Sequence, residues 1–108
     1  MHLAFQYWDQ VAAGQKCAEY RADTAHWRRQ LAGKTHVVLW RGFEKKLPAL
    51  RILEVNVLSI EDAARELKLE VASAELNKIL GKHKTVETML KIRFETFEDI
   101  LPEECMLT

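Results

Sequence analysis

The segment that most constrains the fold is a nearly regular alternation of apolar and polar residues, ALRILEVNVLSI, over residues 49–60. Its apolar positions are Leu50, Ile52, Leu53, Val55 and Val57, with one irregularity. Such an alternation indicates a β-strand, because successive side chains of a strand point to opposite faces. The segment TMLKIRFETF, residues 88–97, alternates in the same way and places Leu90, Ile92 and Phe94 on an inner face. The chain is therefore expected to build a sheet.

Helix signals interrupt the strand signals in an irregular order. Further strands are expected near residues 3–5, 17–21 and 35–42, and helices at residues 5–13, 23–33, 59–69 and 73–81. The helix boundaries come from the N-cap candidates Asp23 or Thr24, Ser59 and Ser73, and from Gly14, Gly33 and Gly81 at the C-terminal ends. The resulting order is strand, helix, strand, helix, two strands, two helices and strand. It predicts a mixed α+β fold rather than a regularly alternating one.

Length and composition indicate one folded cytoplasmic domain. The chain has 108 residues, of which 48% are apolar and 30% charged, values that are ordinary for a globular protein. No apolar run approaches the length of a membrane span, and the first fifteen residues contain Asp9 and no basic residue, unlike a signal peptide. Cys17 and Cys105 are expected to be free thiols, which suits a reducing compartment.

Charge is balanced overall and unevenly distributed. Sixteen Lys and Arg residues match sixteen Asp and Glu residues, so the net charge gives no argument for a nucleic-acid or membrane partner. Residues 1–55 nevertheless hold nine basic against five acidic residues, whereas residues 56–108 hold seven against eleven. A basic surface formed by residues 1–55 is therefore still able to bind an anion.

The segment GQKCAEYR, residues 14–21, concentrates polar chemistry after a helix. If it is a strand, Glu19 and Arg21 share one face and Tyr20 lies on the other. Read without further context, this is a solvated strand face with neighbouring opposite charges. Lys16 precedes Glu19 by three positions, so the two side chains converge only if Lys16 still lies in the turn after Gly14.

This segment and its surroundings resemble the ASCH domain family of the PUA-like superfamily. The resemblance lies in the signature Gly14-x-Lys16-x-x-Glu19-x-Arg21, the Trp-Arg-Arg-x-Leu helix at residues 27–31 and the Arg-Gly-Phe turn at residues 41–43. It covers roughly residues 3–58 and the last strand, and the two-helix insert matches less well. The resemblance implies a small PUA-like mixed β-barrel with flanking helices, as one domain over residues 1–108.

The family includes proposed RNA-binding proteins, a ribonuclease and small amidohydrolases that deacylate N4-acetylcytidine, which this free-standing chain resembles in length. Those enzymes use the signature lysine, a threonine three residues later and a glutamate further on. Lys16 matches the lysine, whereas Glu19 stands in the threonine position. Glu66 and Glu70 are the nearest candidates for the second carboxylate, and Glu70 is assigned to the catalytic set.

Hydrolysis of an exocyclic amide needs a base, an oxyanion stabiliser and a proton for the departing amine. Glu19 is the predicted base and later the acid, and Arg21 is predicted to hold the carboxylate or a ribose or phosphate oxygen. The role of Lys16 is open between oxyanion stabilisation and, if burial deprotonates it, action as a nucleophile or base.

Aromatic side chains are candidates for stacking on cytosine. The full set is Tyr7, Trp8, Tyr20, Trp27, Trp40 and Phe43, of which most are expected in the core. The predicted substrate-binding residues are Tyr7, Tyr20, Arg21, Trp27 and Arg41. The substrate is expected to be a nucleoside, without cofactor, metal or membrane partner. The four histidines follow no metal-ligand spacing, and Cys17 has no evident histidine partner for covalent catalysis.

Two other interpretations compete with hydrolysis. The paired helices at residues 59–80 resemble a DNA-binding helix-turn-helix, but Lys68 stands where a glycine would relieve a left-handed bend, and Asn77 where an apolar residue is expected. We therefore expect these helices to cover the sheet. The main alternative is a non-enzymatic RNA-binding module, whose affinity would fall steeply with salt.

Overall fold

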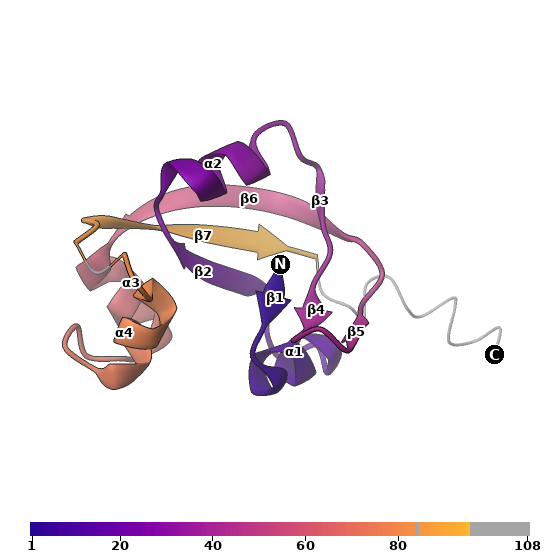
Figure 1. Ribbon diagram of the computed structural model, residues 1–108, viewed down its shortest axis with the longest axis horizontal. Coiled ribbons are helices and arrows are strands. Elements are labelled where there is room, and N and C mark those ends of the chain that lie inside the picture. The colour runs from indigo at the N-terminus through magenta and orange to yellow at the C-terminus, as the bar shows by residue number, and fades with distance from the viewer. Residues whose placement is uncertain (84, 96–108) are drawn as a thin grey trace, which may run out of the picture. The chain divides into compact units, whose positions relative to one another are not determined.

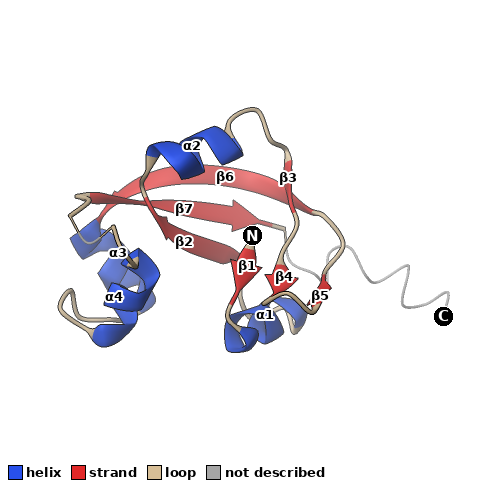
Figure 2. Ribbon diagram, in the orientation of Figure 1, coloured by secondary structure: helices blue, strands red, loops and turns tan. Residues whose placement is uncertain are grey.

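The computed structural model describes residues 1–83 and 85–95 of this chain (Figures 1 and 2). Helices and strands mix in an α+β arrangement, as the sequence predicts. In chain order the elements are β1 (His2–Leu3), α1 (Phe5–Ala12), β2 (Ala18–Ala22), α2 (Ala25–Leu31), β3 (His36–Val37), β4 (Trp40–Arg41), β5 (Lys45–Lys46), β6 (Leu50–Ser59), α3 (Ile60–Leu67), α4 (Ala74–Leu80) and β7 (Thr88–Phe94).

The chain divides into two compact units. Unit 1 comprises Met1–Ala18, Lys34–Leu53 and the segment that begins at Arg93, and unit 2 comprises Glu19–Gly33 and Glu54–Ile92. Strand β6 passes from unit 1 into unit 2, and β7 returns from unit 2 into unit 1. The expectation of a single domain over residues 1–108 stays a prediction.

Unit 1 contains a small mixed sheet in the order β1-β4-β5. Strand β1 pairs with β4 in parallel, with His2 opposite Trp40, and β4 pairs with β5 in antiparallel fashion, with Trp40 opposite Lys46. The β4–β5 turn contains Gly42 at a φ of +56°, and a Cβ atom there would lie 2.6 Å from the Phe5 ring. Any other residue would therefore be strained in its backbone here and would also have to displace the Phe5 ring.

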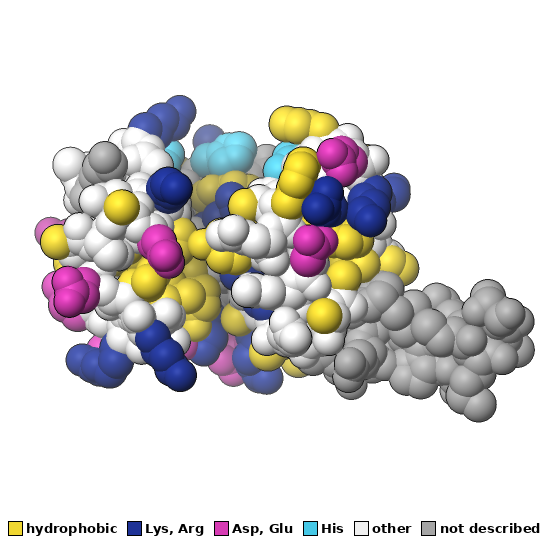
Figure 3. All heavy atoms as spheres, turned by 90° about the horizontal axis from the view of Figure 1, so that it is seen from below, with side chains coloured by type: hydrophobic (Ala, Val, Ile, Leu, Met, Phe, Trp, Pro, Cys, Tyr) yellow, Lys and Arg dark blue, Asp and Glu magenta, His cyan; other side chains and the backbone are white. Residues whose placement is uncertain are grey.

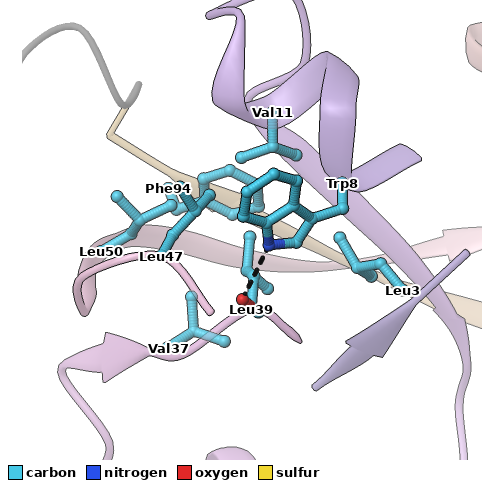
Figure 4. Packing of buried hydrophobic residues seen from close by; sticks show 8 residues of the cluster. All are labelled: Leu3, Trp8, Val11, Val37, Leu39, Leu47, Leu50 and Phe94. Atoms are coloured by element: carbon cyan, nitrogen blue, oxygen red, sulfur yellow. Dashed lines mark hydrogen bonds between the residues drawn. The ribbon is translucent and has the colours of Figure 1, made fainter. Parts of the chain in front are cut away.

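The core of unit 1 surrounds the Trp8 indole of α1 (Figure 4). The buried cluster consists of Leu3, Trp8, Val11, Val37, Leu39, Leu47, Leu50 and Phe94. The indole Nε1 donates a hydrogen bond to the Leu39 carbonyl oxygen at 3.0 Å, so the polar atom of this large side chain is satisfied inside the core. The spacing of Trp8 and Val11 places both on the buried face of α1, as predicted.

The single strand predicted over residues 35–42 is wrong, because the segment forms two short strands in two sheets. Strand β3 pairs with β6, with Val37 opposite Leu50, whereas β4 joins β1 and β5. Between them the Leu39 carbonyl accepts hydrogen bonds from Trp8 Nε1 and from the Leu47 backbone N–H. These long-range donors replace the regular ladder of one continuous strand. The two-residue strand β5 carries no apolar alternation and was not predicted.

The second sheet has the strand order β2-β7-β6-β3. Strand β7 confirms the predicted inner face, since Leu90, Ile92 and Phe94 are buried, and Met89 is buried as well. The predicted residues 96 and 97 of this strand, and the loosely ordered end predicted for residues 101–108, lie outside the described residues.

The buried side chains of unit 2 come from four of its elements. They are Glu19, Tyr20 and Ala22 of β2, Ala63 and Ala64 of α3, Leu76 and Leu80 of α4, and Met89, Leu90 and Ile92 of β7. Its helices begin where the N-cap residues predict. Ser59 Oγ accepts from the Asp62 N–H at 3.1 Å, Ser73 Oγ from the Leu76 N–H at 3.2 Å, and Thr24 Oγ1 from the Trp27 N–H at 3.3 Å. Thr24, rather than Asp23, is thus the N-cap of α2.

None of the helices in the described part of the chain is long and apolar enough to cross a membrane.

Candidate functional site

Along the signature segment the backbone passes from a turn at Lys16 to a strand at Glu19. Gly14 has a φ of +74°, and the backbone N–H groups of Gln15 and Lys16 both donate to the Gln10 carbonyl oxygen, which closes the turn after α1. Strand β2 begins only at Ala18. Lys16 therefore lies in the turn, the position that its predicted role requires.

In unit 1, Lys16 lies over an aromatic ring. Its Nζ atom is 4.6 Å from the centroid of the Tyr7 ring, which α1 presents on a partly buried face. A cation over an aromatic face is attracted by the negative potential of the ring, which limits the conformations of a long side chain. Two predicted site residues, Lys16 and Tyr7, are thus neighbours.

In unit 2, Glu19 is a buried carboxylate on β2, only 7% exposed. Its Oε1 accepts a hydrogen bond from the Tyr20 backbone N–H at 3.0 Å, and its Oε2 lies 3.5 Å from Arg21 Nη2. Glu19 and Arg21 therefore share a strand face, as the alternation predicts. A buried charge is costly unless it is paired, and Arg21 supplies the opposite charge.

The Trp27 ring of α2 also contacts the guanidinium of Arg21. The Arg21 Cζ lies 5.0 Å from the centroid of the Trp27 ring, and the His26 ring meets Trp27 edge-on at 5.2 Å. The Glu19–Arg21–Trp27 cluster thus brings together three predicted site residues within unit 2. The planar guanidinium both stacks on the indole and faces a carboxylate, which lysine does less well.

Tyr20 joins a second polar cluster in unit 2, with Glu66 of α3 and Lys91 of β7. The Tyr20 hydroxyl donates to Glu66 Oε1 at 2.9 Å, and the Lys91 ammonium donates to the same oxygen. Tyr20 thus points its hydroxyl at a carboxylate from the helical insert, and Glu66 is the insert carboxylate that contacts a predicted site residue.

The Tyr20–Glu66–Lys91 cluster shifts the ionisation of all three members. The hydrogen bonds from Lys91 and then Tyr20 hold the pKa of Glu66 below its usual value. Burial, followed by the hydrogen bond to Glu66, raises the pKa of Tyr20, and the hydrogen bond to Glu66 raises the pKa of Lys91. Each shift favours an ionised glutamate between a neutral tyrosine and a charged lysine.

Glu70, the carboxylate assigned to the catalytic set, is exposed in the segment after α3. Its backbone carbonyl oxygen accepts from the Ser73 N–H at 3.0 Å, just before α4 begins. The catalytic role of Glu70 stays a prediction, alongside that of Glu66.

Arg41, a predicted substrate-binding residue, lies in unit 1 among side chains of its own unit. Its guanidinium contacts Asp9 and Glu44 at 3.0 Å each, and its Cζ lies 4.0 Å from the centroid of the Phe5 ring. The hydrogen bond to Asp9 and the charges of both carboxylates raise the pKa of Arg41. In this arrangement Arg41 secures the β4–β5 turn to α1.

Lys16 belongs to unit 1, whereas Glu19, Arg21, Tyr20 and Trp27 belong to unit 2. The convergence of Lys16 and Glu19 therefore stays a prediction. Within each unit the structure pairs predicted residues with one another.

Sequence reasoning missed two polar contacts in unit 2. Lys91, a polar position of the alternating last strand, was not singled out, and it donates to Glu66 Oε1 of α3. Asp23, considered only as a helix cap, instead accepts hydrogen bonds from Arg28 at 2.6 Å and from Thr88 Oγ1 at 2.8 Å. The Arg28 and Thr88 hydrogen bonds lower the pKa of Asp23.

Among residues 1–83 and 85–95, no group of three His, Cys, Asp or Glu side chains is arranged to hold a metal ion. Cys17 is an exposed free thiol.

No family model, curated protein or solved structure matches this chain. Membership of the ASCH family therefore stays a prediction that rests on the signature residues.

Proposed function

We propose that this protein is a metal-independent amidohydrolase that converts N4-acylcytidines, such as N4-acetylcytidine, to cytidine and a carboxylic acid. The observation that supports it most is the buried Glu19 carboxylate, ion-paired with Arg21 beneath the Trp27 ring. A carboxylate kept in position by fixed partners is suited to act as a general base.

In this mechanism Glu19 accepts a proton from the attacking water and returns it to the departing amine. Glu19 Oε1 accepts from the Tyr20 N–H at 3.0 Å and Oε2 lies 3.5 Å from Arg21 Nη2, so the carboxylate that takes the proton is held in place. Lys16 stabilises the oxyanion in the tetrahedral intermediate. The nitrogen–carbon bond then breaks, releasing the acid and cytidine.

The indole of Trp27 and the phenol rings of Tyr7 and Tyr20 are the proposed surfaces for the cytosine ring, with Arg21 and Arg41 as donors to ribose oxygens. We also propose that the fold is the small PUA-like mixed β-barrel expected of the family and that the protein is cytoplasmic.

The test is incubation of purified protein with N4-acetylcytidine, followed by chromatography for cytidine. We expect Lys16→Ala and Glu19→Gln each to lower turnover by about a hundredfold to a thousandfold, the usual effect of losing one such group. Cys17→Ala, which alters an exposed thiol between them in sequence, is the matched control and is expected to retain activity.

Absence of cytidine release, loss of activity with a chelator, or full turnover by Lys16→Ala would each contradict this mechanism. Absence of hydrolysis together with salt-sensitive RNA binding would instead favour the non-enzymatic RNA-binding alternative.

A further inference from the structure

One edge of the long strand β6 is bordered by another strand over a short length only. In the order β2-β7-β6-β3, β6 lies between β7 and β3, and the two residues of β3 pair with the first two of β6 (Figure 2). The Ile52 N–H donates to the Thr35 carbonyl oxygen at 2.8 Å, which extends this contact by one residue. From Leu53 to the strand end at Ser59, no strand in the described part of the chain borders this edge. We call residues 53–59 the β6 edge segment.

The β6 edge segment is uncovered on both of its faces. Residues 53–57 are all exposed, although alternate residues of a strand point to opposite faces. Leu53, Val55 and Val57 point to the same face and are 43%, 43% and 51% exposed. Three apolar side chains in line on one strand form a patch, and such patches mark interaction sites more often than isolated exposed residues do.

The backbone of the segment is directed toward a strand that this chain does not supply. Alternate residues of an antiparallel strand turn their N–H and C=O groups to the same side, and the bond from Ile52 to Thr35 identifies that side. Asn56 and Leu58 therefore direct their backbone groups past the end of β3, where the described residues place no partner strand. Such a row of backbone groups is a template for a further strand.

The sequence of the segment lacks the features that keep strand edges apart. Natural proteins protect such edges with lysine, proline or bulges. The segment, LEVNVLS, contains no Lys, Arg, Pro or Gly, and Glu54 is its one charged residue. The Glu54 carboxylate accepts a hydrogen bond from the Asn56 side-chain amide of the same strand. The segment is therefore expected to accept a partner strand.

We propose that the β6 edge segment pairs with the same segment of a second copy of this chain, antiparallel about a two-fold axis at Asn56. The length of the segment decides the register. Thr35 occupies the edge at Ile52, and α3 begins directly after Ser59. Full overlap therefore places Leu53 opposite Ser59 of the second copy, and Asn56 opposite itself. A two-fold contact uses the same surface on both copies, so the assembly stops at a dimer.

In this register the segment is complementary to itself. Val55 lies opposite Val57 of the second copy, and the symmetry repeats this pair of β-branched residues, which stabilises neighbouring strands. Glu54 lies opposite Leu58, so the two carboxylates of the dimer are about 13 Å apart along the strands and do not oppose each other. The two Asn56 amides face each other, and each amide can both donate and accept.

The charge of the whole chain also permits two copies to meet. Sixteen basic residues balance sixteen acidic ones, so identical copies do not repel each other through net charge. Basic and acidic side chains are intermingled on the face viewed in Figure 3. The inference does not depend on the proposed hydrolysis.

The first test is analytical ultracentrifugation of the full chain over a series of concentrations. We expect a monomer–dimer equilibrium without larger species, in about the micromolar range because a contact of one strand pair is small. Val55→Lys is expected to weaken dimerisation by about tenfold, because it alters both valine pairs of the dimer. Val71→Lys, which alters an exposed apolar residue outside β6, is the matched control and should dimerise like the unaltered chain.

The second test examines the register by disulfide formation, in a chain that carries Cys17→Ser and Cys105→Ser. Facing residues of a hydrogen-bonded antiparallel pair have Cα atoms about 5.5 Å apart, within the range of a disulfide. Oxidised glutathione, which takes the two electrons from the two thiols, is expected to link Asn56→Cys into a covalent dimer on a non-reducing gel. Glu54→Cys, on the same strand face, is the control and should stay unlinked.

Four results would overturn the inference. They are a monomer at every concentration, species larger than a dimer, unaltered dimerisation by a folded Val55→Lys chain, and linkage of Glu54→Cys as efficient as that of Asn56→Cys. Circular dichroism checks that each variant is folded, and the disulfide test decides the matter should Val55→Lys fail to fold.

Discussion

At the scale of single residues, Lys68 adopts a conformation that the sequence argues against. The sequence argument that a lysine at this position opposes a left-handed bend is wrong here, because Lys68 has φ of 58° and ψ of 41° as the C-cap of α3. Its N–H and that of Leu69 donate to the Arg65 and Ala64 carbonyl oxygens. These bonds satisfy the end of the helix and hold a residue where Cβ crowding opposes it.

Lys68→Gly is therefore expected to raise the free energy of unfolding by up to about 1 kcal/mol, because glycine adopts this conformation without crowding. Urea denaturation measures the change. The same substitution at Lys78, within α4, is the control and is expected to destabilise by about 1 kcal/mol, the cost of glycine in a helix. A destabilised Lys68→Gly protein would show that the lysine side chain makes a larger contribution than its backbone strain.

At the scale of elements, the Tyr20–Glu66–Lys91 cluster links β2, α3 and β7 within unit 2. The three elements are distant in sequence and share one carboxylate oxygen. We expect this shared acceptor to help secure the helix α3, whose fully buried side chains, Ala63 and Ala64, are small.

A double-mutant cycle of Tyr20→Phe and Glu66→Gln tests this link. Each single substitution is expected to lower the free energy of unfolding by about 1 kcal/mol, and the pair to couple by about 0.5–1.5 kcal/mol. Glu70→Gln, which alters an exposed carboxylate four residues later, is the matched control and should leave stability nearly unchanged. Additive effects of the two substitutions would mean that the hydroxyl and carboxylate act independently.

At the scale of the whole molecule, two carboxylates make the free energy of unfolding depend on pH in the acidic range. The pKa values of Asp23 and Glu66 are both lowered by hydrogen bonds in the folded chain. A lowered folded pKa means that the stabilisation is present above the unfolded value, near 4, and is lost as pH falls through the folded value. The opposite holds for Tyr20 and Lys91, whose raised pKa values make stability fall only above about pH 10.

Unfolding measured in urea from about pH 6 down to about pH 3 is therefore expected to show a falling free energy. The variant carrying Asp23→Asn and Glu66→Gln should start lower and change less over this range. Arg29→Gln, which alters an exposed arginine of α2, is the control and should keep the acid dependence of the unaltered chain. Equal slopes for the double variant and the unaltered chain would assign the acid dependence to other carboxylates.

The helix starts and one shared strand face could be predicted from the sequence, because they depend on local interactions. The N-caps Thr24, Ser59 and Ser73 bond to N–H groups three residues away, so the pattern that predicts them also contains their partners. The shared face of Glu19 and Arg21 likewise follows from strand periodicity alone.

Contacts between distant residues were decided by tertiary structure. The break between β3 and β4 depends on Trp8 and Leu47, which both donate to the Leu39 carbonyl oxygen. The Glu66 cluster depends on Tyr20 of β2 and Lys91 of β7, which are far apart in the sequence. The cross-strand row of His2, Trp40 and Lys46 exists because three short strands bring these residues side by side. No local pattern contains such pairs, because their free energy comes from partners that only folding brings together.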